Sequence, residues 1–132
     1  MVTRIISITN QKGGVGKTTT SINLSAGLAA RGRRVLLIDM DPQSNSTINF
    51  QIDPEDSIPT MYEKLVEDND INWKKIIRET GIQNLHIAPS SLNLAAADYF
   101  LLNKKDKSIL LERLIREIRD SYDYILIDCP PS

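Results

Sequence analysis

The sequence has 132 residues, which is enough for one domain and too short for two. Its 16 Lys and Arg residues are offset by 17 Asp and Glu residues, so the net charge of −1 excludes binding to nucleic acid through bulk positive charge alone. Hydrophobic residues make up 41% and charged residues 25%, which indicates a folded globular domain. The single cysteine excludes an internal disulfide, so the chain needs no oxidising compartment and cytoplasm is the expected location. No apolar run has the length of a membrane span.

Strands and helices are predicted in alternation along the chain. In chain order, the patterns predict a buried strand over 4–9, a helix over 18–30, a strand over 34–39, a loop with a short helix near 46–50, short surface helices over 60–67 and 72–79, a strand over 84–88, helices over 92–102 and 107–121, and a strand over 124–128. Three of the four strands are continuous apolar runs, which are typical of strands covered on both faces. We therefore expect an α/β fold: a doubly wound, mostly parallel sheet with helices on both faces.

A glycine-rich segment lies between the first predicted strand and the first predicted helix. Glycines let backbone N–H groups approach a phosphate closely, and the helix that follows adds the positive end of its dipole. A lysine in this position places an ammonium group on the β- and γ-phosphates, and the hydroxyl after it ligates Mg²⁺. The predicted nucleotide-binding residues are Lys12, Gly13, Gly14, Val15, Gly16, Lys17, Thr18 and Thr19.

Acidic residues follow two of the predicted strands. Asp39 and Asp41 come at the end of the strand over 34–39, and Asp128 closes the strand over 124–128. Ligands of doubly wound sheets bind beyond the carboxyl ends of the strands, so the three carboxylates are expected beside the phosphate loop. Three acids at one sheet edge favour a metal and catalytic role over simple solvated loop positions.

The phosphate loop departs from the common G-x-x-x-x-G-K-[ST] pattern in a specific way. Gln11 stands where a glycine is expected, and Lys12 directly precedes the glycine pair. This segment resembles the deviant Walker A box, K-G-G-x-G-K-T, of the ParA/MinD family of P-loop ATPases. The resemblance extends over 10–19, 39–47 and 124–131.

That resemblance assigns roles to single residues. It implies that Lys12 reaches across a nucleotide-sandwich dimer to the partner's phosphates, and that Lys17 acts on the phosphates of its own subunit. Asp41 would orient the attacking water or accept its proton. The implied metal residues are Thr18, Asp39 on the metal side, and Asp128, which would hold Mg²⁺ through a water. Lys12, Lys17 and Asp41 are thus the expected catalytic residues.

The segment Asp39–Asn45 further resembles the first switch of the partition branch (ParA, Soj), which the MinD branch typically lacks. The branch of iron-protein reductases is disfavoured because it needs cluster-ligating cysteines, and only Cys129 is present. The implied function is a Mg²⁺-dependent ATPase that dimerises through ATP and binds DNA non-specifically. With a ParB-type partner it would segregate chromosome or plasmid DNA, in the cytoplasm and associated with the nucleoid.

Two alternatives stay open: a MinD-like membrane-associated positioning ATPase, and a non-catalytic nucleotide-binding module. The chain stops four residues after a strand of buried type, with no helix to cover it. We therefore expect residues 1–132 to be the N-terminal part of a single P-loop ATPase domain, which need not be active by itself. Most DNA contacts would then lie in residues beyond this sequence, and no membrane partner is expected. His86, Cys129 and Trp73 are predicted to have structural roles.

Overall fold

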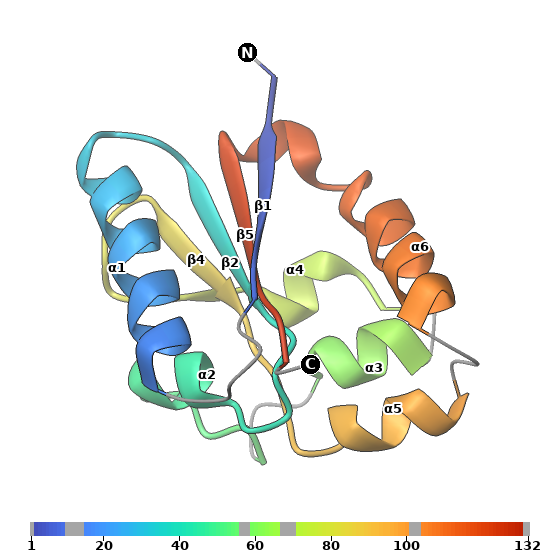
Figure 1. Ribbon diagram of the computed structural model, residues 1–132. Coiled ribbons are helices and arrows are strands. Elements are labelled where there is room, and N and C mark those ends of the chain that lie inside the picture. The colour runs from blue at the N-terminus through green and yellow to red at the C-terminus, as the bar shows by residue number, and fades with distance from the viewer. Residues whose placement is uncertain (1, 10–14, 56–58, 67–70, 101–103, 131–132) are drawn as a thin grey trace.

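The structure is a computed structural model that describes residues 2–9, 15–55, 59–66, 71–100 and 104–130. Strands and helices alternate along it (Figure 1). Their bounds are β1 Arg4–Ile8, α1 Val15–Ala30, β2 Val35–Asp39, α2 Asn45–Asn49, α3 Met61–Val66, α4 Trp73–Ile76, β3 Arg78–Glu79, β4 Leu85–Ala88, α5 Leu94–Phe100, α6 Lys104–Ile115 and β5 Tyr124–Asp128, with a short 3₁₀ helix over Arg119–Ser121 before the last strand.

The described strands form one sheet in the order β1-β5-β2-β4-β3. Every neighbouring pair is parallel except β3 with β4, which is antiparallel. In Figure 1 the carboxyl ends of the parallel strands converge at the lower end of the molecule, where α1 begins. The register brings Asp39 of β2 directly beside Asp128 of β5. The predicted mostly parallel α/β sheet is thereby confirmed.

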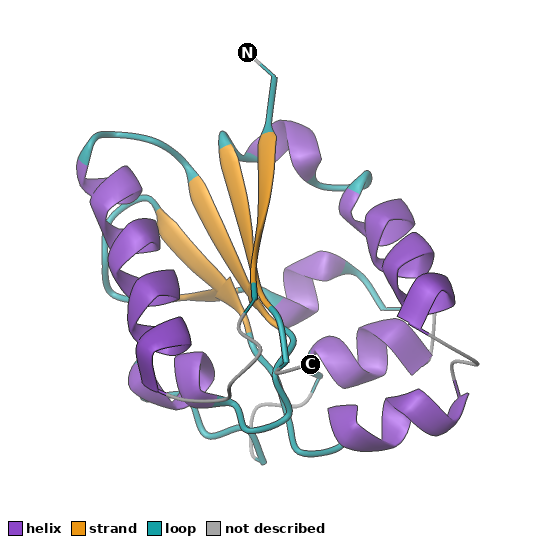
Figure 2. Ribbon diagram, viewed as in Figure 1, coloured by secondary structure: helices purple, strands orange, loops and turns teal. Residues whose placement is uncertain are grey.

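Helices cover both faces of the sheet, as Figure 2 shows by colour. Successive side chains of a strand point to opposite faces, so β2 contributes to two separate cores. Leu36 and Ile38 pack into a core with α3, α4 and α6, whereas Val35 and Leu37 pack toward α1. All five residues of β2 are buried, as expected for a strand between two helical layers.

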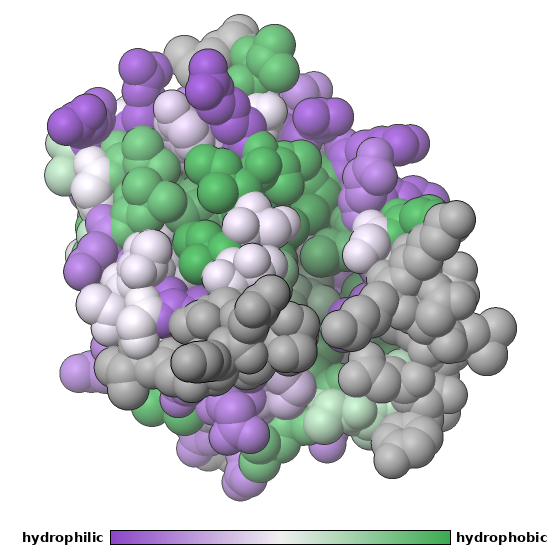
Figure 3. All heavy atoms as spheres, viewed as in Figure 1, coloured by the Kyte–Doolittle hydropathy of each residue, from purple (hydrophilic) through white to green (hydrophobic). Residues whose placement is uncertain are grey.

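The first strand differs from the prediction of a buried strand. β1 pairs only with β5 in the described sheet, and none of its five residues is fully buried. Ile5 is 39% exposed, and apolar side chains reach the surface around this strand (Figure 3). Its apolar residues fit a covered strand, but among the described strands β1 lies at the edge of the sheet and has β5 as a neighbour on one side alone.

Two predicted helices are also shorter than expected. The region predicted as a surface helix over 72–79 is helical only in α4, after which Arg78 and Glu79 pair with β4 as an edge strand. α4 is not a surface helix, because Trp73 and Ile76 lie in the core. The helix predicted over 107–121 ends at Ile115 and continues as turns and a 3₁₀ segment. No helix in the described part of the chain is long and apolar enough to cross a membrane.

Candidate functional site

The candidate site lies where α1 begins, at the carboxyl edge of the parallel strands (Figure 1). α1 has 16 residues and no acidic residue in its first turn, so the positive end of its dipole is not neutralised by its own side chains. Lys17 and Thr18 are buried in this first turn, and Thr19 is exposed. Of the other predicted loop residues, Lys12, Gly13 and Gly14 lie outside the described residues, as does the side chain of Val15.

Lys17 is the centre of the site's electrostatics. Its Nζ atom contacts Asp128 Oδ1 and lies 3.3 Å from Asp41 Oδ2. All three side chains are almost fully buried, and Asp128 Oδ2 also accepts a 2.6 Å hydrogen bond from Ser46 Oγ. Burial alone lowers the pKa of Lys17, but the hydrogen bond and charge of Asp128, together with Asp41, outweigh it and raise the pKa overall. The ammonium therefore stays charged between two carboxylates that come from separate strand ends.

Asp39 has partners from this chain on both carboxylate oxygens. Oδ2 accepts hydrogen bonds from the Thr47 backbone N–H at 2.9 Å and from Thr47 Oγ1 at 2.6 Å. Oδ1 accepts the Asp41 backbone N–H at 3.1 Å. Burial raises the pKa of Asp39 to about 7, although the Thr47 hydrogen bonds act in the opposite direction. These contacts hold the segment that follows β2. The role of Asp39 on the metal side stays a prediction.

That segment folds back over the strand ends as a turn followed by α2. Asp41 Oδ1 accepts the backbone N–H of Gln43 at 3.0 Å, which fixes the direction of the carboxylate. Ser44 follows in the left-handed region, at φ 60° and ψ 28°, and is buried. Burial and the left-handed backbone conformation both disfavour a large side chain at this position. The predicted short helix near 46–50 is confirmed as α2.

Three hydroxyl residues of this cluster, Ser46, Thr47 and Ser90, were missed by the sequence reasoning. Ser90 follows β4, and its Oγ donates a 2.6 Å hydrogen bond to the Asp41 backbone carbonyl. Its backbone N–H donates to Thr47 Oγ1 at 2.9 Å. The available signal was its position two residues past the end of a parallel strand, the same rule that selected Asp41.

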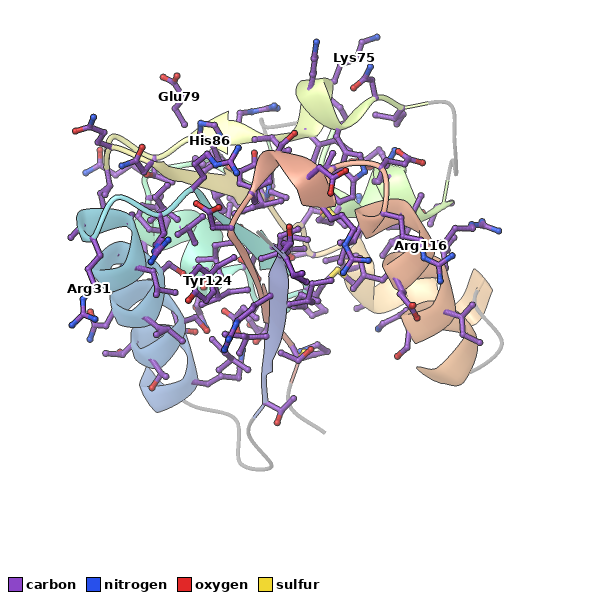
Figure 4. The ribbon with its side chains drawn as sticks, turned by 90° about the horizontal axis from the view of Figure 1, so that it is seen from above. Arg31, Lys75, Glu79, His86, Arg116 and Tyr124 are labelled. Atoms are coloured by element: carbon purple, nitrogen blue, oxygen red, sulfur yellow. The ribbon has the colours of Figure 1, made fainter. Side chains whose placement is uncertain are left out.

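The residues assigned structural roles have structural partners. Trp73 is buried and donates from Nε1 to the Leu114 carbonyl at 2.9 Å. His86 Nδ1 lies 2.9 Å from the Tyr122 hydroxyl, and the two rings meet edge to face. Figure 4 looks onto the end of the molecule opposite the candidate site. It shows His86 beside Glu79 of the neighbouring strand, and Arg31 and Arg116 pointing outward.

Burial raises the pKa of the Cys129 thiol, which is half-buried against the core. A thiol held mainly in its protonated form is a poor nucleophile, so the predicted packing role is the better account of this residue.

The residues present fit a nucleotide phosphate with Mg²⁺. The site combines a buried ammonium, the start of a long helix, a threonine next to that ammonium, and carboxylates from two strands. Among the described residues, no three His, Cys, Asp or Glu side chains gather as a complete metal site. Mg²⁺ bound together with phosphates does not need one, because it takes most of its oxygen ligands from phosphates and waters.

The first crossover helix of this parallel sheet follows a lysine-bearing phosphate loop, and acids lie at the neighbouring strand ends. This combination defines a P-loop nucleotide-binding protein. The chain belongs to the AAA domain family, whose model matches residues 3–132.

Its relatives include the sporulation initiation inhibitor protein Soj of Bacillus subtilis, 47% identical over 98% of this chain and 50% of that protein. The chromosome partitioning protein ParA of Myxococcus xanthus is 44% identical over 99% of this chain and 46% of that protein. These similarities confirm the predicted resemblance to ParA/Soj-type partition ATPases.

Among solved structures, cobyrinic acid a,c-diamide synthase from Mycobacterium smegmatis with bound ADP and magnesium superposes with a TM-score of 0.90. It is 35% identical, and the match covers 99% of this chain and 52% of that one. The chain thus spans about half the length of the relatives it matches.

Proposed function

We propose that this chain binds ATP with Mg²⁺ and hydrolyses ATP, as part of a ParA-like partition protein. The observation that carries the proposal is the placement of Lys17 at the start of α1, between Asp41 and Asp128 at the carboxyl edge of the sheet. The ADP and magnesium bound by the M. smegmatis synthase, which shares this fold, support the choice of ligand.

Each residue has a distinct task in this proposal. Lys17 would exchange its carboxylate partners for the β- and γ-phosphates, whose negative charge it neutralises. The Thr18 hydroxyl and Asp128 would hold Mg²⁺, which supplies charge neutralisation to the phosphates. Asp41, whose carboxylate is fixed in direction by Gln43, would orient the attacking water. Lys12 would act on the phosphates of a partner subunit, as the resemblance implies.

The wider function is proposed from the relatives named Soj and ParA. In the proposal, the whole protein dimerises through ATP, binds DNA non-specifically and responds to a ParB-type partner. Its place would be the cytoplasm, on the nucleoid, where it would segregate chromosome or plasmid DNA.

The test is ATP turnover and ATP-dependent dimerisation of the intact protein, compared with Lys17→Ala and Asp41→Ala variants. We expect Lys17→Ala to lose nucleotide binding and Asp41→Ala to bind ATP without hydrolysing it. Asp53→Ala, which removes an exposed acid from the loop after α2, is the matched control and is expected to behave as the unaltered protein. If the unaltered protein hydrolyses ATP no faster than the Lys17→Ala variant, the enzymatic proposal is overturned.

The alternatives give different outcomes in the same experiment. A non-catalytic module would bind ATP with no release of phosphate. A MinD-like positioning protein would hydrolyse ATP and bind vesicles of anionic phospholipid when ATP is present. A partition protein is expected to bind DNA instead of those vesicles in the ATP-bound form.

A further inference from the structure

The backbone of Asp41 is held on both sides by polar groups of the fold. Its N–H donates to Asp39 Oδ1, and its carbonyl accepts both the Ser44 N–H at 2.8 Å and the Ser90 hydroxyl at 2.6 Å. Asp41, Ser44 and Ser90 are all buried. These contacts fix the backbone of Asp41 and therefore the point from which its carboxylate projects, while the Gln43 N–H fixes the direction of the carboxylate itself.

Thr47 links the same two strand ends a second time. Its hydroxyl donates to Asp39 Oδ2 at 2.6 Å and accepts the Ser90 backbone N–H at 2.9 Å. Thr47 and Ser90 are both fully buried. We call these two side chains the hydroxyl clamp, because together they bind the segment 41–47 to the ends of β2 and β4.

We propose that the hydroxyl clamp positions Asp41 for ATP hydrolysis. Ser90 and Thr47 are positioning residues, which act by holding Asp41 in its productive direction. The inference rests on the proposed function of Asp41. Among the described residues neither hydroxyl contacts Lys17: Ser90 acts on the Asp41 backbone directly, and Thr47 acts on it through Asp39 and the backbone of Ser90. A small displacement of a water-orienting carboxylate costs turnover while leaving the phosphate-binding residues in place.

The clamp can be removed without changing the shape of the segment. Thr47→Val replaces the hydroxyl by a methyl group of similar size, whereas Thr47→Ser keeps the hydroxyl. Ser90→Ala removes the second hydroxyl. Ser91→Ala is the matched control, because Ser91 lies next in sequence and, among the described residues, its Oγ accepts only the Asn93 N–H at 3.2 Å.

Two measurements on the intact protein test the proposal. The first is steady-state ATP hydrolysis, together with the Kd of a non-hydrolysable ATP analogue. For Ser90→Ala and Thr47→Val we expect kcat to fall about 10-fold or more, with KM and the analogue Kd within about 2-fold of the unaltered protein. Thr47→Ser and Ser91→Ala are expected to keep most of kcat.

The second measurement is amide hydrogen exchange in the absence of nucleotide. The clamp variants are expected to exchange faster at residues 43–47, with unchanged protection in β2 and β5. If Ser90→Ala fails to fold, the shape-matched pair Thr47→Val and Thr47→Ser gives the same comparison. This readout needs no turnover, so it separates failure of the clamp from failure of the proposed ATPase function.

Three results would overturn the inference. In the first, Thr47→Val and Ser90→Ala keep the kcat of the unaltered protein. In the second, kcat and analogue affinity fall together, which assigns the hydroxyls to binding. In the third, exchange rises throughout the sheet, which makes them general stabilising residues.

Discussion

Lys17 and Asp128 are in direct contact although they are 111 positions apart in the sequence. One lies in the first turn of α1 and the other ends β5, and their side chains are 1% and 0% exposed. The contact therefore joins the beginning and the end of the described chain at the site itself. An ion pair this well buried is costly to break by removing one partner, because the remaining charge loses its counterion.

We expect Lys17→Met to lower the free energy of unfolding of the nucleotide-free protein by about 3 kcal/mol. It leaves two buried carboxylates, Asp41 and Asp128, without their cation. The double variant Lys17→Met, Asp128→Asn is expected to cost less than the sum of the two single changes, by about 1 kcal/mol or more. Urea unfolding of the three variants provides the comparison, and additive effects would contradict the coupling.

Asp39 gives the protein a specific dependence on pH. Its pKa is about 7 in the folded state, above the value of an unfolded carboxyl, because it is buried. The folded state then binds more protons than the unfolded state between about pH 4 and 7, so the stability contribution of Asp39 falls as the pH rises through that range. Above about pH 7 it levels off.

Asp39→Asn is expected to remove this contribution. The difference in unfolding free energy between the unaltered protein and the variant should change by a few kcal/mol from pH 4 to 8, at about 1.4 kcal/mol per pKa unit. Urea titrations at pH values across this range measure it. Parallel stability curves for the two proteins would show that Asp39 titrates at its ordinary pKa.

Trp73 is predicted to be a major stabilising residue of the core on the α6 side. Trp73→Phe removes the indole hydrogen bond to the Leu114 carbonyl, which keeps the Glu117 N–H at 3.2 Å, and it leaves a cavity beside α6, for a combined cost of about 2 kcal/mol. Ile109→Ala, on the exposed side of α6, is expected to cost less than about 0.5 kcal/mol. Trp73 is the only tryptophan, so the variant has no tryptophan fluorescence. Unfolding is therefore followed by circular dichroism.

Cys129 is expected to react slowly with a thiol-reactive disulfide reagent at pH 8. Half-burial and a raised pKa both reduce the amount of accessible thiolate. Urea at concentrations that unfold the protein should increase the labelling rate severalfold. Equal rates in the folded and unfolded protein would contradict the packing role of this side chain.

The sheet and its two helical layers could be predicted because uninterrupted apolar strands are typical of sheets covered on both sides. The exposure of β1 could not be predicted, since the sequence pattern shows the apolar residues Ile5, Ile6 and Ile8 but not the position of the strand in the sheet. The short strand β3 was missed for a related reason: two residues, Arg78 and Glu79, carry no periodicity. Tertiary pairing with β4 decides their conformation.

The site shows the same division. Lys17, Asp41 and Asp128 could be selected because charged groups at loop and strand ends are conspicuous in a sequence. Ser90 and Thr47 could not, because serine and threonine are common in turns and their importance lies in which atoms they meet. The contacts of Asp39 with Thr47 likewise depend on the chain folding back after β2.

The pairing of β1 with β5 has a consequence for how the protein is made. Arg4 pairs with Tyr124, so the only described neighbour of β1 is β5, the last of the described strands along the sequence. Closing a loop of that length delays the contact, whereas β2 and β4 can pair much earlier. The apolar residues of β1 are therefore synthesised well before this partner, and they stay without it until residues 124–128 have been made.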